Sequence, residues 1–420
     1  MTTRDNFGNL KTADSFTLFN YYPTPYTGTS SIDSDILMKN TNGSATISYV
    51  STSGAANYIN LDCSASGGNA IVQTKQPMDY LSGKSQLIYL TGVLLSRAIV
   101  SGETVTSRIG LYDVDSLTNN PPTPTAGTYF QTDGTNLQFA DVVQGTTPNI
   151  VNQSSWNYDT FNGSGPSGLT LIISNANTVS LIFIERAWLG VGIVKVGFVI
   201  NGIGYLANTF THDTLSVQYT SIPRQQITYQ IVATTLTPSA GDIANRMMCF
   251  TNISKGGFFP LGRRNSFNTG NAGVSLASTA NKYILFALKI NSTYTKGTIK
   301  MIKGSFGFKA STGTMGLYEI HLVTSTVGTI TGTLTYSSLT NSIVQYANGN
   351  GTQTLSVDGY KISSGFLNGN TNINFNTVDY ETLLNRVIVT ANSGDTLCIV
   401  GNSNGNNDIM FASIDFIESL

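Results

Sequence analysis

Charged side chains are scarce in this sequence. Lys and Arg together number 22 and Asp and Glu 23, so charged residues make up 11% of the chain, against about 25% in a typical soluble protein. Long solvent-exposed helices carry Glu, Lys and Arg on their outer faces, and this chain offers few of them. The hydrophobic share is an ordinary 40%, and the chain contains 42 Gly. This composition argues against a helix-rich fold and favours β-strands joined by many turns.

Other shortages exclude whole classes of partner. The formal net charge is −1, without the clusters of Lys and Arg that bind a phosphate backbone, so we expect no direct nucleic-acid partner. No apolar run reaches the roughly 18 residues that cross a bilayer, and the first residues lack the apolar centre of a signal peptide. We therefore expect no membrane span and no export by that route.

Cysteine is also rare. The three cysteines, Cys63, Cys249 and Cys398, are too few and too scattered for a disulfide framework. Free cysteines usually behave as small hydrophobic residues. We expect three buried thiols.

The two histidines lie in different halves of the chain. His212 is expected in a surface loop, and His321 in an alternating strand beside Glu319. Neither neighbourhood offers the fixed arrangement with Cys, Asp or Glu that zinc sites and catalytic triads require. The sequence therefore predicts no metal site and no cofactor.

Carboxylates give no better indication of catalysis. A glycosidase needs a pair of them across the scissile bond, and the candidates Glu185, Asp159 and Asp213 are not spaced to share one strand face. An ion pair of Glu185 with Arg186 at a sheet edge is the favoured interpretation. We predict that the chain is not an enzyme, with a glycoside hydrolase as the least favoured alternative.

Short alternating strands are what the sequence does contain. A turn-forming pair, Asp133 and Gly134, separates two apolar runs in residues 128–143, which is typical of a hairpin. The strongest stretch is 179–210, where Val194, Val196 and Phe198 share one face of a strand that ends at Asn201 and Gly202. The second half repeats this pattern and ends in a half-buried strand over 408–420.

Many short strands with Gly and Asn turns, in two blocks, predict an all-β protein of two tandem β-sandwich domains of jelly-roll type. The expected order is an extended N-terminal arm over 1–60, a first sandwich over 61–257, a linker over 258–273 and a second sandwich over 274–420.

The expected arm carries an aromatic cluster. Phe16, Phe19, Tyr21 and Tyr22 precede prolines that restrict the chain to extended shapes. An aromatic arm needs a docking surface, either on its own domain or on a neighbouring subunit. These four residues are candidate assembly contacts.

The two tryptophans, Trp156 and Trp188, flank the strongest strands of the first block. Core packing is the favoured role, and a sugar-stacking platform is the alternative. On that alternative, both are candidate glycan contacts.

Several segments resemble one family in order along the chain. The segment at 5–19, DNFGNLKTADSFTLF, is similar to an FGRLRVSEPFTLF-type opening. The segment at 83–87, GKSQL, is identical to a GKSQL segment of the same family. The segment at 188–198, WLGVGIVKVGF, is similar to a WLGVGRVR-type segment. The family comprises virion-associated structural proteins of large DNA viruses and of tailed, often marine, phages. The resemblance covers residues 5–257. It implies a location in the virion, with other virion proteins as partners and a homo-oligomeric state.

Two functions follow from these expectations. The first is a virion structural protein, such as a minor capsid, decoration or tail-associated component, that assembles through its sandwich domains and aromatic arm. The alternative is a glycan-binding host-attachment protein of a virus particle, with a host glycan as partner.

Overall fold

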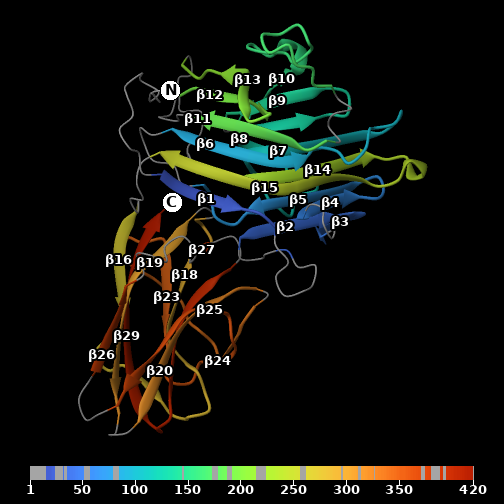
Figure 1. The fold of residues 1–420 in the computed structure, drawn as a ribbon. Coiled ribbons are helices and arrows are strands. Elements are labelled where there is room, and N and C mark those ends of the chain that lie inside the picture. The colour runs from blue at the N-terminus through green and yellow to red at the C-terminus, as the bar shows by residue number, and fades with distance from the viewer. Residues whose placement is uncertain are drawn as a thin grey trace. The chain divides into compact units, whose positions relative to one another are not determined.

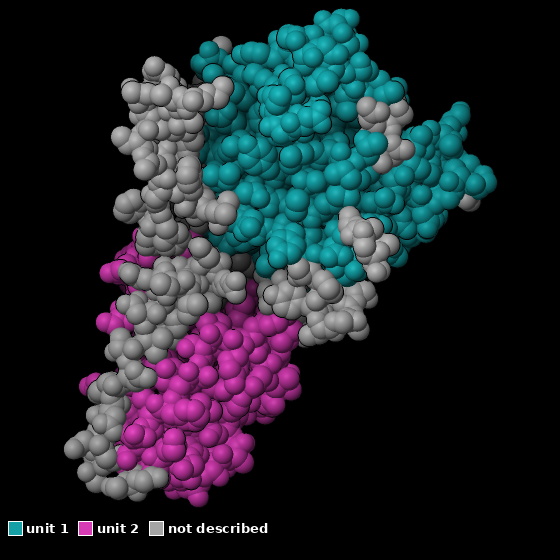
Figure 2. Space-filling model, in the orientation of Figure 1, with its two compact units in different colours: residues 1–258 teal, residues 259–420 magenta. Residues whose placement is uncertain are grey.

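The computed structural model describes residues 16–23, 32, 36–51, 57–78, 85–143, 146–172, 178–186, 192–213, 224–255, 262–294, 297–310, 314–325, 327–369, 374–379, 388–390 and 394–419. The chain forms two compact units, residues 1–258 and 259–420 (Figure 2). In the described part the regular structure is β-strand, apart from two short 3-10 turns, Gln153–Ser155 and Pro238–Ala240. None of its helical segments is long and apolar enough to cross a membrane.

Two antiparallel sheets build the first unit (Figure 1). Sheet I has the order β13 (Ile203–Phe210), β12 (Val194–Ile200), β11 (Ser180–Arg186), β6 (Gln86–Val93), β15 (Ile243–Lys255), β4 (Asn57–Cys63) and β3 (Ala45–Ser51), and β1 (Phe16–Tyr21) pairs with β15. Sheet II has the order β10 (Asn149–Asn152), β9 (Leu137–Val142), β8 (Pro124–Thr132), β7 (Thr104–Val114), β14 (Ile227–Thr235), β5 (Gly68–Thr74) and β2 (Leu37–Asn42). One hydrophobic core includes inward-facing residues of both sheets.

The strand and turn patterns of the sequence are confirmed in this unit. Val194, Val196 and Phe198 are buried, and the turn between β12 and β13 contains Asn201 at φ 52° and Gly202 at φ 78°. Asp133 and Gly134 join β8 to β9 as a hairpin. Residues that tolerate positive φ suit the tight turn after β12, so the local sequence fixes its position.

The second unit is also a sandwich of two sheets. Sheet III has the order β16 (Arg263–Asn268), β29 (Asp408–Ser419), β19 (Thr298–Lys309) and β26 (Asn374–Asp379), with β17 (Val274–Leu276) paired to β29 and β27 (Ile388–Thr390) to β19. Sheet IV has the order β21 (Thr329–Thr331), β24 (Thr354–Val357), β18 (Tyr283–Ile290), β28 (Thr396–Ser403), β20 (Met315–Val323) and β25 (Tyr360–Asn368), with β23 (Val344–Asn348) between β18 and β22 (Ser337–Ser338).

Successive strands of this unit cross from one sheet to the other. The chain passes from β18 in sheet IV to β19 in sheet III and back to β20, and later from β28 to β29. This crossing is typical of a jelly roll. The last strand buries alternate residues, as its sequence predicted, with Met410, Ala412, Ile414 and Phe416 in the core. The predicted fold class, all-β with jelly-roll-like sandwiches, is therefore correct.

The structure corrects the two segments expected to lie outside the sandwiches. Residues 16–21, 37–42, 45–51 and 57–63 do not form an arm separate from the first sandwich, because they are strands β1 to β4 of its two sheets. Their alternate apolar residues, such as Leu37 and Ile59, are buried in its core. The expected linker also contains a strand, since β16 pairs with β29 over Arg263–Asn268. Gly and Asn in these segments mark turns between short strands rather than linkers.

His212 is not the surface residue that the sequence suggested. It is 3% exposed, with Nε2 at 2.8 Å from Oδ2 of Asp141 and Nδ1 at 2.6 Å from the carbonyl oxygen of Gly192. Thr128 donates to the other oxygen of Asp141. Because His212 follows β13 of sheet I and Asp141 lies in β9 of sheet II, this contact ties the two sheets together.

Burial disfavours the charged imidazolium, but the hydrogen bond and negative charge of Asp141 and the carbonyl of Gly192 outweigh it and raise the pKa of His212 above its ordinary value. Both ring nitrogens face acceptors, so the doubly protonated ring fits the site.

We predict that His212→Gln lowers the free energy of unfolding of the first unit by about 2 kcal/mol near pH 6, since hydrogen bonds to charged groups contribute about that much. A raised histidine pKa stabilises the fold below the unfolded value of about 6.5, and this contribution is lost as pH rises through the folded pKa. Urea unfolding of both proteins at pH 6, 7.5 and 9 should show the difference shrinking with pH. A difference that stays constant across this range would contradict a charged His212.

Candidate functional site

The outer face of sheet I carries a groove of about 560 Å³. It lies over β6, β11 and β15, with contributions from β12, β13 and the turn between them. Among the described residues that line it, Glu185 alone is charged. The lining residues are Leu87, Tyr89, Thr91, Leu181, Phe183, Glu185, Val199, Gly202, Gly204, Cys249, Phe250 and Thr251.

Side-chain alternation explains why aromatic residues stand in this groove. In β11, Ile182 and Ile184 are fully buried between the sheets, so Leu181, Phe183 and Glu185 face outward and are half-buried. The same pattern in β6 buries Ile88 and Leu90 and turns Leu87, Tyr89 and Thr91 outward. These central strands therefore carry large apolar side chains on both faces.

Phe183 leans over a glycine of the neighbouring strand. A Cβ atom on Gly197 would lie 2.7 Å from Cε1 and 2.8 Å from Cζ of Phe183, and one on Gly204 would lie 3.9 Å from Cε1. The same Cβ would also lie 2.1 Å from the backbone oxygen of Tyr205, so position 197 requires glycine. The ring is therefore supported by the sheet beneath it, and it also lines the groove.

The cross-strand neighbours of Phe183 and Glu185 supply polar groups to the groove. Tyr89 is the cross-strand partner of both Phe183 and Thr251. Glu185 is paired with Lys195 of β12, where its Oε2 lies 3.9 Å from Nζ, with 29% and 43% of the two side chains exposed. The groove thus combines the outward rings of Tyr89 and Phe183 with threonine hydroxyls and one weak ion pair. Such a surface suits a ligand that has both an apolar face and hydroxyl-bearing edges.

The predicted ion pair between Glu185 and Arg186 is wrong, because consecutive strand residues point to opposite faces. Arg186 is 2% exposed, and its Nε and Nη1 donate to the side-chain oxygens of Gln86 and Gln225. Strand β11 is also not an edge, since it lies between β12 and β6.

Asp159, another carboxylate considered for catalysis, is fixed in a turn. It is 5% exposed and accepts hydrogen bonds from the backbone N–H groups of Phe161 and Ser167.

Trp156 is a core residue and not a surface platform. It is 4% exposed, its Nε1 donates to the carbonyl of Val151 at 3.1 Å, and its ring lies 5.0 Å from that of Phe139 and 6.0 Å from that of Phe198. The core-packing interpretation is confirmed for Trp156, and its role as a glycan contact is wrong. Trp188 lies outside the described residues.

The four aromatic residues expected to contact other subunits have different surroundings in and after β1. Phe19 and Tyr21 pack against Phe250 of the same chain, with ring centroids 5.7 and 5.5 Å apart. These two side chains serve their own domain, whereas Tyr22 is 65% exposed and remains a candidate contact. Phe16 belongs to β1, and its side chain lies outside the described part.

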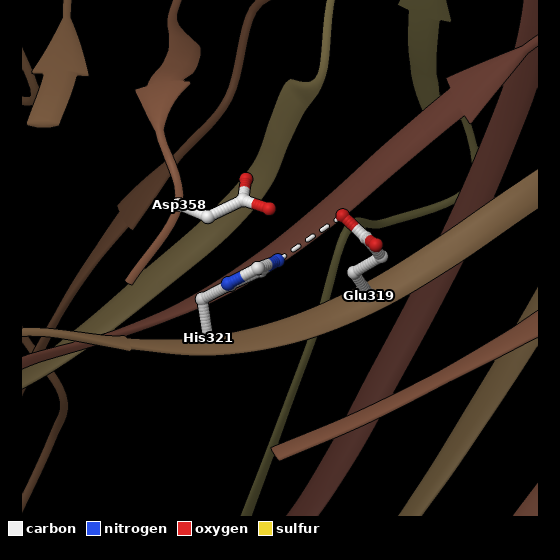
Figure 3. Close-up of side chains that lie close together, drawn as sticks. All are labelled: Glu319, His321 and Asp358. Atoms are coloured by element: carbon white, nitrogen blue, oxygen red, sulfur yellow. Dashed lines mark hydrogen bonds and ion pairs between the residues drawn. The ribbon is translucent and has the colours of Figure 1, made fainter. Parts of the chain in front are cut away.

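A second cluster, Glu319, His321 and Asp358, lies in the other unit and has the residue types of a metal centre. The three residues offer ligand atoms within 4.8 Å of one another. Figure 3 shows Glu319 and His321 side by side on one strand, β20, with Asp358 facing them. Glu319 and His321 are buried and Asp358 is exposed.

Two lysines occupy the acidic side of this cluster. Lys282 Nζ lies 2.8 Å from Oε2 of Glu319 and 2.7 Å from Oδ1 of Asp358, and Lys361 contacts the other oxygen of Glu319. A divalent cation would have to displace Lys282. The donor set therefore fits an ion-pair network, which joins the loop after β24 to sheet IV, better than it fits a metal site.

Burial disfavours the charged form of Glu319, but hydrogen bonds from Lys282, Lys361 and His321 lower its pKa to about 2. We predict that Glu319→Gln lowers the free energy of unfolding of the second unit by about 2 kcal/mol at pH 7, less than for a fully buried pair because the lysines are partly exposed. The matched control is Asp358→Asn, because the Asp358 side chain is 46% exposed. This change should lower the free energy of unfolding by less than about 1 kcal/mol.

The stabilising contribution of Glu319 should depend on pH. A lowered carboxyl pKa stabilises the fold above the unfolded value of about 4.3, and this contribution is lost as pH falls through about 2. Denaturant unfolding from pH 7 to pH 2 should show the variant and the natural protein converging in stability. Equal stabilities at pH 7 would show that the network contributes nothing.

Comparison with known proteins gives distant structural similarity. The chain is similar to an endo-1,3-β-glucanase from Streptomyces sioyaensis, with 11% identity, TM-score 0.36, and coverage of 59% of this chain and 99% of that one. Arcelin-5, a lectin-like defense protein from Phaseolus vulgaris, is 12% identical to the chain with a TM-score of 0.34. That match covers 57% of this chain and 99% of arcelin-5. A carbohydrate esterase from the Shiga toxin-encoding bacteriophage phi24B is 15% identical with a TM-score of 0.30. That match covers 52% of this chain and 90% of the esterase.

No family model matches the chain, and no curated protein matches it. The ligand and the activity must therefore be argued from the chain's own residues.

Proposed function

We propose that this chain is a carbohydrate-binding protein and that the groove on sheet I is its binding site. The observation that carries the proposal is the position of Phe183, which leans over Gly197 beside Tyr89 and lines the groove. An aromatic ring that the sheet supports from below loses little conformational freedom when a ligand packs on it.

Sugar chemistry matches the rest of the lining. A pyranose ring has C–H faces that pack on aromatic rings and hydroxyl edges that need hydrogen-bond partners. Thr91 and Thr251 offer hydroxyl groups, and Glu185 offers carboxylate oxygens that accept hydrogen bonds from sugar hydroxyls. The aromatic and polar residues of the groove stand on adjacent strands, which suits an extended ligand.

We assign the groove a binding role and not a catalytic one. Glycoside hydrolysis by the usual mechanism needs two carboxyl groups on either side of the scissile bond. Among the described lining residues, Glu185 is the single carboxylate, and Lys195 is its neighbour.

The place of action that we propose is a virus particle, where the chain contributes to host attachment. This part of the proposal rests on the sequence segments at 5–19, 83–87 and 188–198 that resemble virion-associated proteins. Virion assembly is the second candidate function. It is favoured by the exposed Tyr22 at the end of β1 and by the scarcity of surface charge, which lowers the repulsion between subunits.

We predict that Phe183→Ala weakens glycan binding about tenfold, because an aromatic stacking contact contributes about 1 to 1.5 kcal/mol. Phe366→Ala is the matched control, since Phe366 is 67% exposed in the other unit and its loss should leave affinity unchanged. Binding is measured by a glycan array followed by calorimetry on the best ligand. Equal losses in both variants, or no glycan bound by the natural protein, would reject the groove as a glycan site.

The virion location has its own test. Particles purified on a density gradient and treated with detergent should retain the chain in a fixed ratio to the major shell protein, measured by quantitative mass spectrometry. Tyr22→Ser should lower that ratio if the exposed ring contacts a neighbour, whereas Tyr158→Ser, which alters another exposed tyrosine of the same unit, should not. Absence of the chain from such particles would reject the virion location and leave the glycan proposal standing.

A further inference from the structure

The charge of the groove constrains the class of sugar it can hold. Glu185 is the charged residue among the described lining residues, and Lys195 lies directly across the strand pair from it. The two charges are of opposite sign and 3.9 Å apart. The described lining therefore carries one negative charge, which the neighbouring Lys195 balances.

A charged sugar would disturb this balance. A uronic or sialic acid placed over Phe183 would bring its carboxylate near Glu185, which lies two residues along the same strand face. Like charges held close together on a protein surface repel each other, so a carboxylate at that position would weaken binding. Lys195 does not compensate fully, because it is not among the described residues that line the groove and 43% of its side chain is exposed to solvent.

We infer that the groove selects neutral sugars over acidic sugars of the same shape, and that Glu185 is the residue that sets this preference. The inference rests on the proposed glycan-binding function and adds the ligand class to it. Glu185 acts by accepting hydrogen bonds from neutral hydroxyl groups and by repelling carboxylates.

The same geometry predicts how the preference changes when either charge is removed. Glu185→Gln retains the size and the hydrogen-bonding capacity of the side chain but leaves Lys195 without its anionic neighbour. The groove then carries one positive charge, so acidic sugars should gain affinity. Lys195→Met leaves Glu185 uncompensated, and acidic sugars should bind still more weakly while neutral sugars are little affected.

The experiment uses matched pairs of ligands and the full-length chain. Neutral oligosaccharides of several linkages are compared with the same oligosaccharides after oxidation of their primary hydroxyl groups to carboxylates. Calorimetry at low salt gives both affinities for the natural protein, Glu185→Gln and Lys195→Met, and circular dichroism verifies that each variant is folded. For the natural protein we expect the neutral member of a pair to bind at least about tenfold tighter.

For Glu185→Gln we expect the difference to fall to about threefold or less, and for the natural protein we expect it to shrink at high salt, where surface charges are screened. Equal or tighter binding of the acidic member by the natural protein would overturn the preference while preserving the glycan-binding function. An unchanged preference in Glu185→Gln would remove Glu185 from the role. If no member of any pair binds, the proposed function itself fails, and the inference fails with it.

Discussion

The side-chain alternation of β11 and β6 is the constraint on which the candidate site depends. Each strand must bury one face against sheet II, and Ile182, Ile184 and Ile88 do so. The opposite face is then fixed by the period of two, which places Phe183 and Tyr89 side by side on the outer surface. A shift of register by one residue would move the isoleucines out and the aromatic rings in, so the packing that stabilises the sandwich also holds the groove in place.

Some of the few charged side chains of this protein connect separate parts of its sandwiches. His212 and Asp141 join sheet I to sheet II inside the first unit, and Lys282, Glu319 and Asp358 join a loop to sheet IV in the second. Each contact pairs opposite charges where a lone buried charge would be costly. The residue types that first suggest a metal centre or a catalytic histidine are therefore used here for tying structural layers together.

Sequence reasoning was most accurate where the signal was local. The turn at Asn201 and Gly202 and the inward residues of the last strand follow from positive φ preferences and from alternation, which involve neighbours in the chain. It was least accurate where partners are distant. Residues 37–51 and 57–60 lack long apolar runs, yet they form strands because Leu37 and Ile59 meet a core built from residues far along the chain. The groove does not follow from the sequence, because its outward residues lie on strands that become neighbours only in the folded sheet.

By itself, the sequence determined that the protein is β-rich, built as two sandwiches and poor in charged side chains, because composition and local periodicity carry that information. Only the tertiary structure decided which aromatic residues face outward together. Trp156 is enclosed by Phe139 and Phe198, whereas Phe183 faces outward from β11 and lies over Gly197 of the adjacent strand. That outcome depends on which strands become neighbours, and strand pairing across the chain is fixed by the packing of the whole domain.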